Sequence, residues 1–195
     1  MKTFLNTMIS GLCTILWIVL MLGFSDVKIA ISTLLAAVIH ELGHMAVLFI
    51  LGKDFSFPRA VASGFRIKTS VKLSYKEEVA VAIGGPLSNI VLFLFFITPF
   101  PEFAIINLIT ALSNLLPMKD FDGYRILSAS LSLFGSASIS DKIMPHVTVF
   151  FSSLLVFFSL FTIMISNGGY WIFFIFFIVL IKEILFLQKH TFFEH

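Results

Sequence analysis

The chain has 195 residues, of which 58% are hydrophobic and 12% are charged, and its mean hydropathy is +1.04. A soluble domain carries about 25% charged residues, so this chain lacks the polar surface that would cover a water-soluble globule. The formal net charge of +2 gives no reason to expect a nucleic-acid partner, and a single cysteine, Cys13, excludes disulfides within the chain and cysteine zinc sites. We therefore predict one membrane domain over 1–195, in which His, Asp or Glu must hold any transition metal.

A membrane-spanning helix needs about 20 mainly apolar residues. The candidate segments are 4–24, 29–51, 78–98, 103–118, 146–166 and 169–188. The first has no small-residue cleavage site after it, so we expect a retained span rather than a signal peptide. The predicted fold class is an all-α integral membrane protein with about six transmembrane helices and a short β element at the membrane surface.

The basic residues indicate the orientation in the membrane. Six spans place both termini and the two long connections, 52–77 and 119–145, on one side. That side then carries all of the 13 Lys and Arg residues except Lys28. Positive charge collects on the cytosolic side, so we expect both termini in the cytosol, with the chain in a bacterial cell membrane.

The second apolar segment contains the pattern H-E-x-x-H, formed by His40, Glu41 and His44. Positions i and i+4 share one face of a helix, so both imidazoles can bind one metal ion. Zinc held by three protein ligands lowers the pKa of a bound water to about 7, and Glu41 is placed to take its proton as it attacks an amide carbonyl. The alternative is a buried His–Glu hydrogen-bond cluster that locks helices together, but an idle mid-bilayer carboxylate costs about 2.5–3.5 kcal/mol on insertion scales.

The connection 52–77 contains an alternating segment that ends at Leu73. Apolar Phe65, Ile67 and Val71 alternate with basic and polar residues, and this period of two predicts an amphipathic strand. The sequence leaves two roles of this strand open. Its apolar side chains enter the lipid while Lys68 and Lys72 meet anionic headgroups, or its edge binds an extended substrate through Phe65, Ile67 and Val71.

The fourth apolar segment is interrupted near its end, where the sequence runs from Asn114 to Pro117. A proline breaks a helix, and the exposed backbone groups are tolerated in a membrane only where protein buries them or they line a watery cavity. Asp120 and Asp122 follow the break, and on chemistry alone either can be a third metal ligand. Glu77 and Glu78 are further alternatives, although acidic residues at that position more simply favour a helix start.

The two motifs together resemble the signatures of the site-2 protease family of intramembrane zinc proteases. That family carries H-E-x-x-H on one span and N-x-x-P-x-x-x-x-D-G on a later one, and the segment Asn114–Gly123 is complete for the second pattern. Gly52, and Gly85-Pro86 with Asn89, extend the resemblance over about 30–130, the core of the family.

The resemblance implies a metal site and roles for its residues. One zinc ion per chain would be held by His40, His44 and Asp122, with Glu41 acting on the water; the family spacing selects Asp122 over Asp120. It also implies that Asn114 holds the substrate or stabilises the oxyanion, whereas an interhelical hydrogen bond is the structural alternative.

The function implied by the resemblance is hydrolysis of a peptide bond within or near the transmembrane segment of another membrane protein. The expected partners are a membrane protein or membrane-anchored peptide as substrate, the lipid bilayer, and a regulatory membrane protein, with no nucleic acid. The outline is a minimal six-span core, similar to the sporulation-type branch without its CBS domains. Two alternatives are a non-catalytic membrane binding or transport protein with a structural polar centre, and a membrane metalloprotease that cuts exposed peptides, with Glu77 or Glu78 as ligand.

Overall fold

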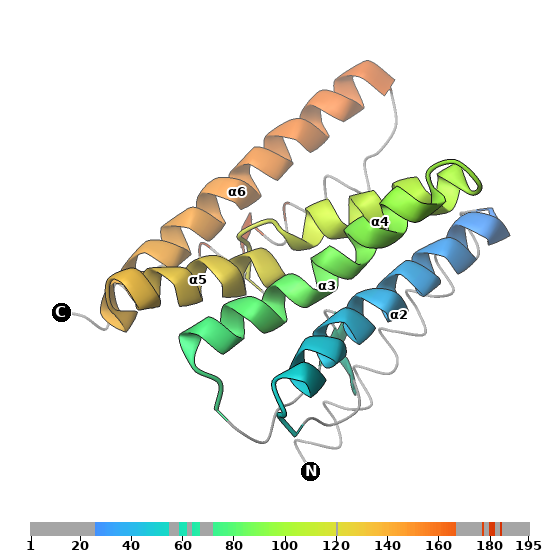
Figure 1. Ribbon diagram of the computed structural model, residues 1–195. Coiled ribbons are helices and arrows are strands. Elements are labelled where there is room, and N and C mark those ends of the chain that lie inside the picture. Colours follow the sequence, from blue (N-terminus) through green and yellow to red (C-terminus); the bar gives the residue numbers. More distant parts are fainter. Residues whose placement is uncertain are drawn as a thin grey trace, which may run out of the picture. The chain divides into compact units, whose positions relative to one another are not determined.

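The computed structural model describes residues 26–54, 59–61, 64–66, 72–119 and 121–166, together with 177, 180, 181 and 184 (Figure 1). The predicted span 4–24 and nearly all of the predicted span 169–188 lie outside these residues. Contacts along the chain divide it into two units, Met1–Leu115 and Leu116–His195. The longer helices of the first unit are α2, α3 and α4, and those of the second are α5 and α6.

The three helices of the first unit pack against one another in all three pairs. They are α2 (Val27–Ile50), α3 (Tyr75–Phe96) and α4 (Pro101–Asn114). The first two match the predicted spans 29–51 and 78–98 within a few residues. The third is shorter than the predicted segment 103–118, because it ends at Asn114, ahead of Pro117. A proline disfavours helical backbone at the residue before it, so the predicted break is confirmed.

The ends of α2 and α3 are fixed by local hydrogen bonds. After α2, Gly52 adopts a φ of 64°, the left-handed conformation that ends many helices and that glycine takes without strain. At the start of α3, Ser74 and Glu77 form a capping box, in which the backbone N–H of Ser74 donates to Glu77 Oε2 over 2.8 Å. Lys53 Nζ lies 2.8 Å from the same carboxylate. Glu77 thus ties the two ends of the connection between the helices together.

The crossing of α2 and α3 depends on two glycines. A Cβ atom built on Gly43 would collide with the backbone oxygen of Gly84, and one built on Gly84 would lie 2.7 Å from the backbone oxygen of Gly43. A backbone atom cannot move aside as a side chain can, so only glycine permits this approach. The close contact brings the inward faces of the two helices within reach of each other's side chains.

Burial in the first unit is the reverse of that in a soluble domain. Among the fully buried residues are small or polar ones, including Ala36, Ala82, Asn89 and Asn107. Large apolar side chains lie outside, and Phe95, for example, is 75% exposed. Water would penalise so much exposed apolar surface, whereas lipid does not distinguish it from a packed core.

The second unit contains α5 (Asp122–Phe134) and α6 (Ala137–Ser166). These helices contact each other, and Ser140 Oγ donates to the Ser128 backbone oxygen over 3.1 Å. The sequence predicted only a connection over 119–145 and a span from 146. The prediction missed α5 because several serines and Arg125 make this segment too polar for a span.

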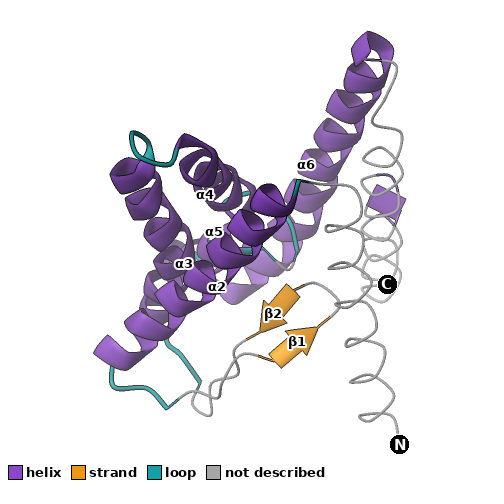
Figure 2. Cartoon of the chain, turned by 90° about the vertical axis from the view of Figure 1, so that its right-hand side faces the viewer, coloured by secondary structure: helices purple, strands orange, loops and turns teal. Residues whose placement is uncertain are grey.

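A small antiparallel sheet lies in the connection between α2 and α3 (Figure 2). It consists of β1 (Arg59–Val61) and β2 (Gly64–Arg66), with Ala60 opposite Phe65. Only the start of the predicted strand 65–73 overlaps β2. Ile67 and Val71 lie outside the described residues, so the middle of the strand stays a prediction, whereas Lys72 and Leu73 at its predicted end are not in a strand.

Three of the described helices are long and apolar enough to cross a membrane, namely α2, α3 and the Ala137–Phe161 part of α6. Together with the inverted burial, they support a membrane protein. The number of six spans, the cytosolic termini and the bacterial membrane remain predictions.

Candidate metal centre

His40 and His44 lie one turn apart on the inward face of α2, and each is only 5% exposed. Their Nε2 atoms are 3.2 Å apart, and the ring planes are nearly perpendicular, at 88°. The i, i+4 spacing therefore brings the two imidazoles together, as the sequence predicted.

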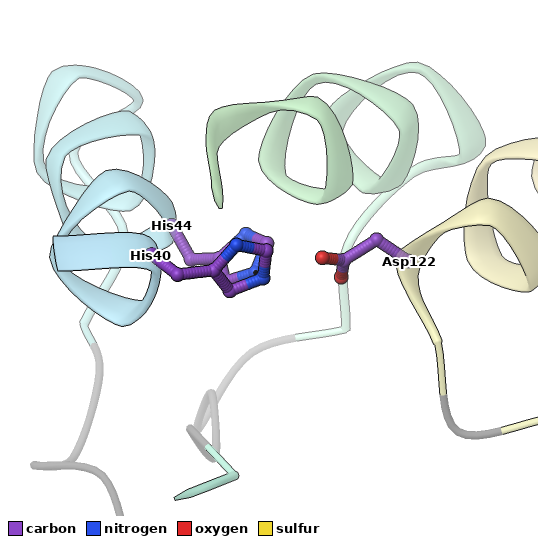
Figure 3. Close-up of side chains that lie close together, drawn as sticks. All are labelled: His40, His44 and Asp122. Carbon is purple, nitrogen blue, oxygen red and sulfur yellow. Dashed lines mark hydrogen bonds between the residues drawn. The ribbon is translucent and has the colours of Figure 1, made fainter. Parts of the chain in front are cut away.

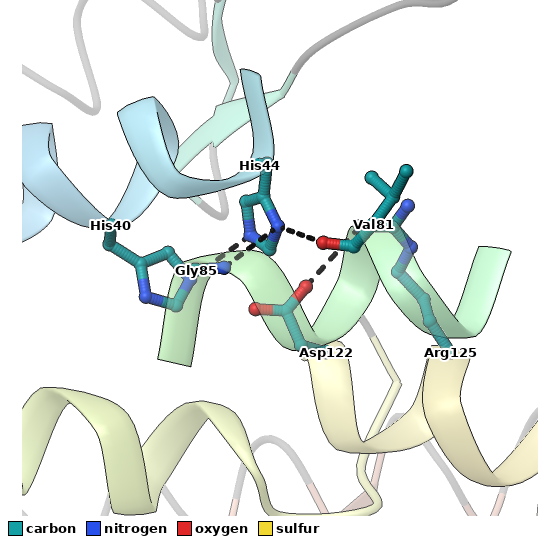
Figure 4. Close-up of polar contacts among 6 residues, drawn as sticks. All are labelled: His40, His44, Val81, Gly85, Asp122 and Arg125. Atoms are coloured by element: carbon teal, nitrogen blue, oxygen red, sulfur yellow. Dashed lines mark hydrogen bonds and ion pairs between the residues drawn. The ribbon is translucent and has the colours of Figure 1, made fainter. Parts of the chain in front are cut away.

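The other ring nitrogen of each histidine is held by an acceptor on α3. His40 Nδ1 lies 2.7 Å from Asn89 Oδ1. His44 Nδ1 lies 2.7 Å from the Val81 backbone oxygen (Figure 4). Carbonyl oxygens only accept, so both Nδ1 atoms carry the proton and donate. The Gly85 N–H also lies 3.2 Å from His44 Nδ1. A protonated nitrogen cannot accept a hydrogen bond, so we assign the shorter contact, in which His44 Nδ1 donates to the Val81 backbone oxygen. In a neutral ring of this tautomer, Nε2 is the nitrogen that can bind a metal ion.

Two Nε2 atoms that face each other over 3.2 Å need a proton or a metal ion between them. Zinc binds histidine nitrogens at about 2.0–2.1 Å, and a tetrahedral angle then separates two such nitrogens by about 3.3 Å. The spacing of the Nε2 atoms therefore fits a shared zinc ion. A carbonyl or amide acceptor behind each ring is the usual arrangement around metal-binding histidines, because it fixes the tautomer and the ring orientation.

Gly85 of α3 keeps the space in front of the imidazoles open. A Cβ atom built there would lie 2.5 Å from His44 Nε2 and 2.7 Å from His40 Nε2. Any side chain at this position would displace the nitrogens that face each other. The absence of a side chain at Gly85 thus leaves a space beside the two Nε2 atoms that a methyl group would fill.

Asp122 is the first residue of α5 and is 6% exposed. The N-terminus of a helix favours a negative charge, because its backbone N–H groups are not used within the helix. Arg125 Nη1 lies 3.3 Å from Asp122 Oδ1, one turn along α5, so one carboxylate oxygen has a cationic partner. Both effects favour the ionised carboxylate that a metal ligand must be.

His40 and His44 of the first unit and Asp122 of the second are the candidate ligands of one metal ion, and each offers one ligand atom (Figure 3). Two imidazoles and a carboxylate are a donor set that zinc accepts. Each of the three ligands implied by the family resemblance is buried, and their binding of one metal ion stays a prediction.

The other predicted site residues have separate positions. Glu41 is half-buried on α2 beside His40, and Asn114 is the last residue of α4, where its Nδ2 donates to the Thr110 backbone oxygen over 3.0 Å. Phe65 lies in β2. Asp120 lies outside the described residues. Glu77 serves the helix start, as its sequence position indicated, rather than the metal group.

Sequence reasoning missed several residues around the ligands. It did not identify Arg125 beside Asp122, the Val81 carbonyl behind His44, or Asn107, which contacts Asn89. A signal for Asn107 was present, since an asparagine within an apolar helix must find a polar partner. Its partner depends on how the helices pack, which one sequence does not reveal.

Comparison with known proteins places the fold. No family model matches the chain, and no curated protein sequence matches it. Among solved structures, the chain is similar to the site-2 protease from Methanocaldococcus jannaschii, with a TM-score of 0.65 and 20% sequence identity, over 89% of this chain and 85% of that one. At this identity the likeness concerns the fold, so the chain has the fold of a site-2 protease. The resemblance to the site-2 protease family that the two motifs indicated is therefore confirmed for the fold.

We predict that Gly85→Ala lowers the affinity for Zn²⁺ by about tenfold or more, because the added methyl group displaces both Nε2 atoms. Gly43→Ala is the matched control, since it also adds one methyl group at the crossing of α2 and α3, but against backbone. Thermal unfolding in excess chelator separates the two effects: Gly43→Ala should lower the unfolding temperature more than Gly85→Ala, because its methyl group meets backbone whereas that of Gly85→Ala meets the ends of side chains. Wild-type zinc affinity in Gly85→Ala would show that zinc binding does not need the space at Gly85.

Proposed function

We propose that this chain is an intramembrane zinc metalloprotease of the site-2 protease type, which hydrolyses a peptide bond within or near the transmembrane segment of a membrane protein. The observation that carries the proposal is the histidine pair on α2, an apolar helix long enough to span a membrane. Both Nδ1 atoms are engaged by acceptors, and both Nε2 atoms face one position at a separation of 3.2 Å.

His40, His44 and Asp122 would hold the metal ion. A bound zinc ion supplies a water molecule of lowered pKa and polarises the substrate carbonyl. Glu41 adjoins the first ligand on α2, and we assign it the proton transfers. Its carboxylate takes a proton from the attacking water and passes it to the amide nitrogen as the peptide bond breaks.

Asn114 is proposed to hold the substrate backbone or to stabilise the oxyanion. An amide group carries two N–H donors, and the bond to the Thr110 backbone oxygen uses one of them. The second donor can serve the substrate carbonyl. The position of Asn114 at the end of α4, where the helix breaks, supports this role because regular helical packing ends there.

The substrate must unwind before it is cut, because the carbonyls of a helix are hydrogen-bonded and shielded by side chains. Unwinding in lipid leaves backbone groups unpaired, and a strand edge can satisfy them. We propose that the segment with Phe65, Ile67 and Val71 provides that edge. The paired strands β1 and β2 support an extended backbone at its beginning.

Glu41→Gln tests the proposed reaction. Cleavage of a tagged single-span substrate should fall by at least about 100-fold, because the amide cannot accept the proton. Zinc content, measured by elemental analysis, should stay near wild type, because Glu41 is not a ligand. Wild-type cleavage should stop when a zinc chelator is added. A loss of zinc in proportion to the loss of activity would make Glu41 a ligand instead.

The third ligand is tested by comparing two neighbouring carboxylates. Asp122→Ala should lose both zinc and cleavage, since three protein ligands are needed for a catalytic zinc site. Asp120→Ala, the matched control, should keep most of both. The opposite result would show that the family spacing does not hold at this site.

Proline substitution tests the proposed substrate edge. Ile67→Pro or Val71→Pro should slow cleavage in liposomes, because proline removes a backbone donor and distorts the strand, while zinc content stays the same. The double variant Lys68→Ala/Lys72→Ala should have the smaller effect. If the lysines anchor the strand to headgroups instead, the order reverses, most clearly in anionic lipid. Proline variants that cleave at the wild-type rate would end the edge proposal.

A further inference from the structure

A chain of buried side-chain hydrogen bonds runs from α4 through α3 to the first metal ligand. Asn107 of α4 and Asn89 of α3 are both fully buried. Asn89 Nδ2 donates to Asn107 Oδ1 over 2.8 Å, and His40 Nδ1 lies 2.7 Å from Asn89 Oδ1. Three helices of the first unit are thus linked through two asparagines to one imidazole.

The direction of each bond follows from groups that can only accept. Asn107 Nδ2 lies 2.9 Å from the Phe103 backbone oxygen, so the amide nitrogen of Asn107 points there and its oxygen faces Asn89. Asn89 Nδ2 therefore donates both to Asn107 Oδ1 and to the Ala36 backbone oxygen, at 2.8 Å and 3.0 Å. The oxygen of Asn89 is then left for His40, which must donate from Nδ1.

The two histidines differ in what fixes them. His44 is held by a backbone carbonyl, whose position is set by α3 itself. His40 is held by the side chain of Asn89, which can rotate, and an amide that turned over would present a donor to His40 Nδ1. That donor would favour the wrong tautomer, with the proton on the nitrogen that should bind the metal. Two acceptors, Asn107 Oδ1 and the Ala36 backbone oxygen, hold the N–H groups of Asn89 away from His40.

We propose that Asn107 is a positioning residue for the metal centre, acting on His40 through Asn89. This inference rests on the proposed function in assuming that the histidine pair binds zinc. Asn107 lies on the same inward face of α4 as the buried Ala104 and Ala111, and two turns before Asn114. It fixes a ligand without contacting metal or substrate.

The experiment measures zinc affinity in purified detergent-solubilised protein, by competition between Zn²⁺ and a chelator, with no substrate present. Asn107→Leu keeps the size of the side chain and removes the acceptor, and it should weaken zinc binding about tenfold, as loss of a group behind a ligand does. Thr110→Val is the matched control: Thr110 Oγ1 bonds only to the Ile106 backbone oxygen of its own helix in the described contacts. Its affinity should stay within about twofold of wild type.

A double-variant cycle separates positioning from simple helix adhesion. If Asn107 acts through Asn89, Asn107→Leu should weaken zinc binding by less than about twofold when Asn89→Leu is already present, because neighbours in one network are not additive. Equal losses in both backgrounds would overturn the proposal, and so would wild-type affinity in Asn107→Leu alone.

Asn107→Asp decides the matter if the leucine variant does not fold. It keeps an acceptor for Asn89 and loses the donor to Phe103, so its zinc affinity should stay within about threefold of wild type; a loss of about tenfold or more overturns the proposal. The outcome is distinct from that of the proposed function. Wild-type protein that binds zinc but cleaves no substrate would refute the protease alone, whereas Asn107→Leu that binds zinc normally would refute only the positioning role.

Discussion

The Nε2 atoms of His40 and His44 face each other at 3.2 Å inside an apolar helix bundle, and the neighbouring structure follows from this contact. Neutral imidazoles can be buried there only if each Nδ1 proton has an acceptor, and α3 supplies both. For α3 to come so near, the helices must cross at Gly43 and Gly84, and for the imidazoles to keep their place, position 85 must lack a side chain. Glycines and acceptors thus form one arrangement around the pair.

The surroundings explain why this arrangement belongs in a membrane. Outward surfaces of α2 and α3 carry large apolar side chains, while the inward surfaces carry alanine, glycine, asparagine and histidine. In lipid, apolar side chains gain nothing by being buried, and helices associate instead through close packing of small residues and hydrogen bonds between polar ones. A polar centre is therefore compatible with stability in this bundle, provided that each buried donor and acceptor is satisfied.

Those parts of the molecule that depend on local spacing could be predicted from the sequence. The shared face of His40 and His44, the helix break ahead of Pro117 and the spans at α2 and α3 all follow from periodicity or from the chemistry of one residue. Side-chain contacts between helices could not be predicted from local spacing. Asn107 was not identified, because its partner lies 18 residues away on another helix. The helix α5 was missed because the search was for long apolar segments, and this helix is short and carries polar residues on one side. On chemistry alone Asp120 and Asp122 were equivalent, and only the family pattern distinguished them.

Charge gives a reason for the particular set of acidic residues in the proposed centre. A zinc ion with two neutral imidazoles carries a charge of +2, which is expensive to place in a medium of low dielectric constant. One carboxylate ligand, Asp122, and one carboxylate for proton transfer, Glu41, bring the sum to zero. Arg125 pairs with Asp122, but its side chain is 36% exposed, so water can screen its charge. A third histidine in place of Asp122 would leave a net positive centre in lipid, whereas two carboxylates permit a divalent metal to be held among apolar helices.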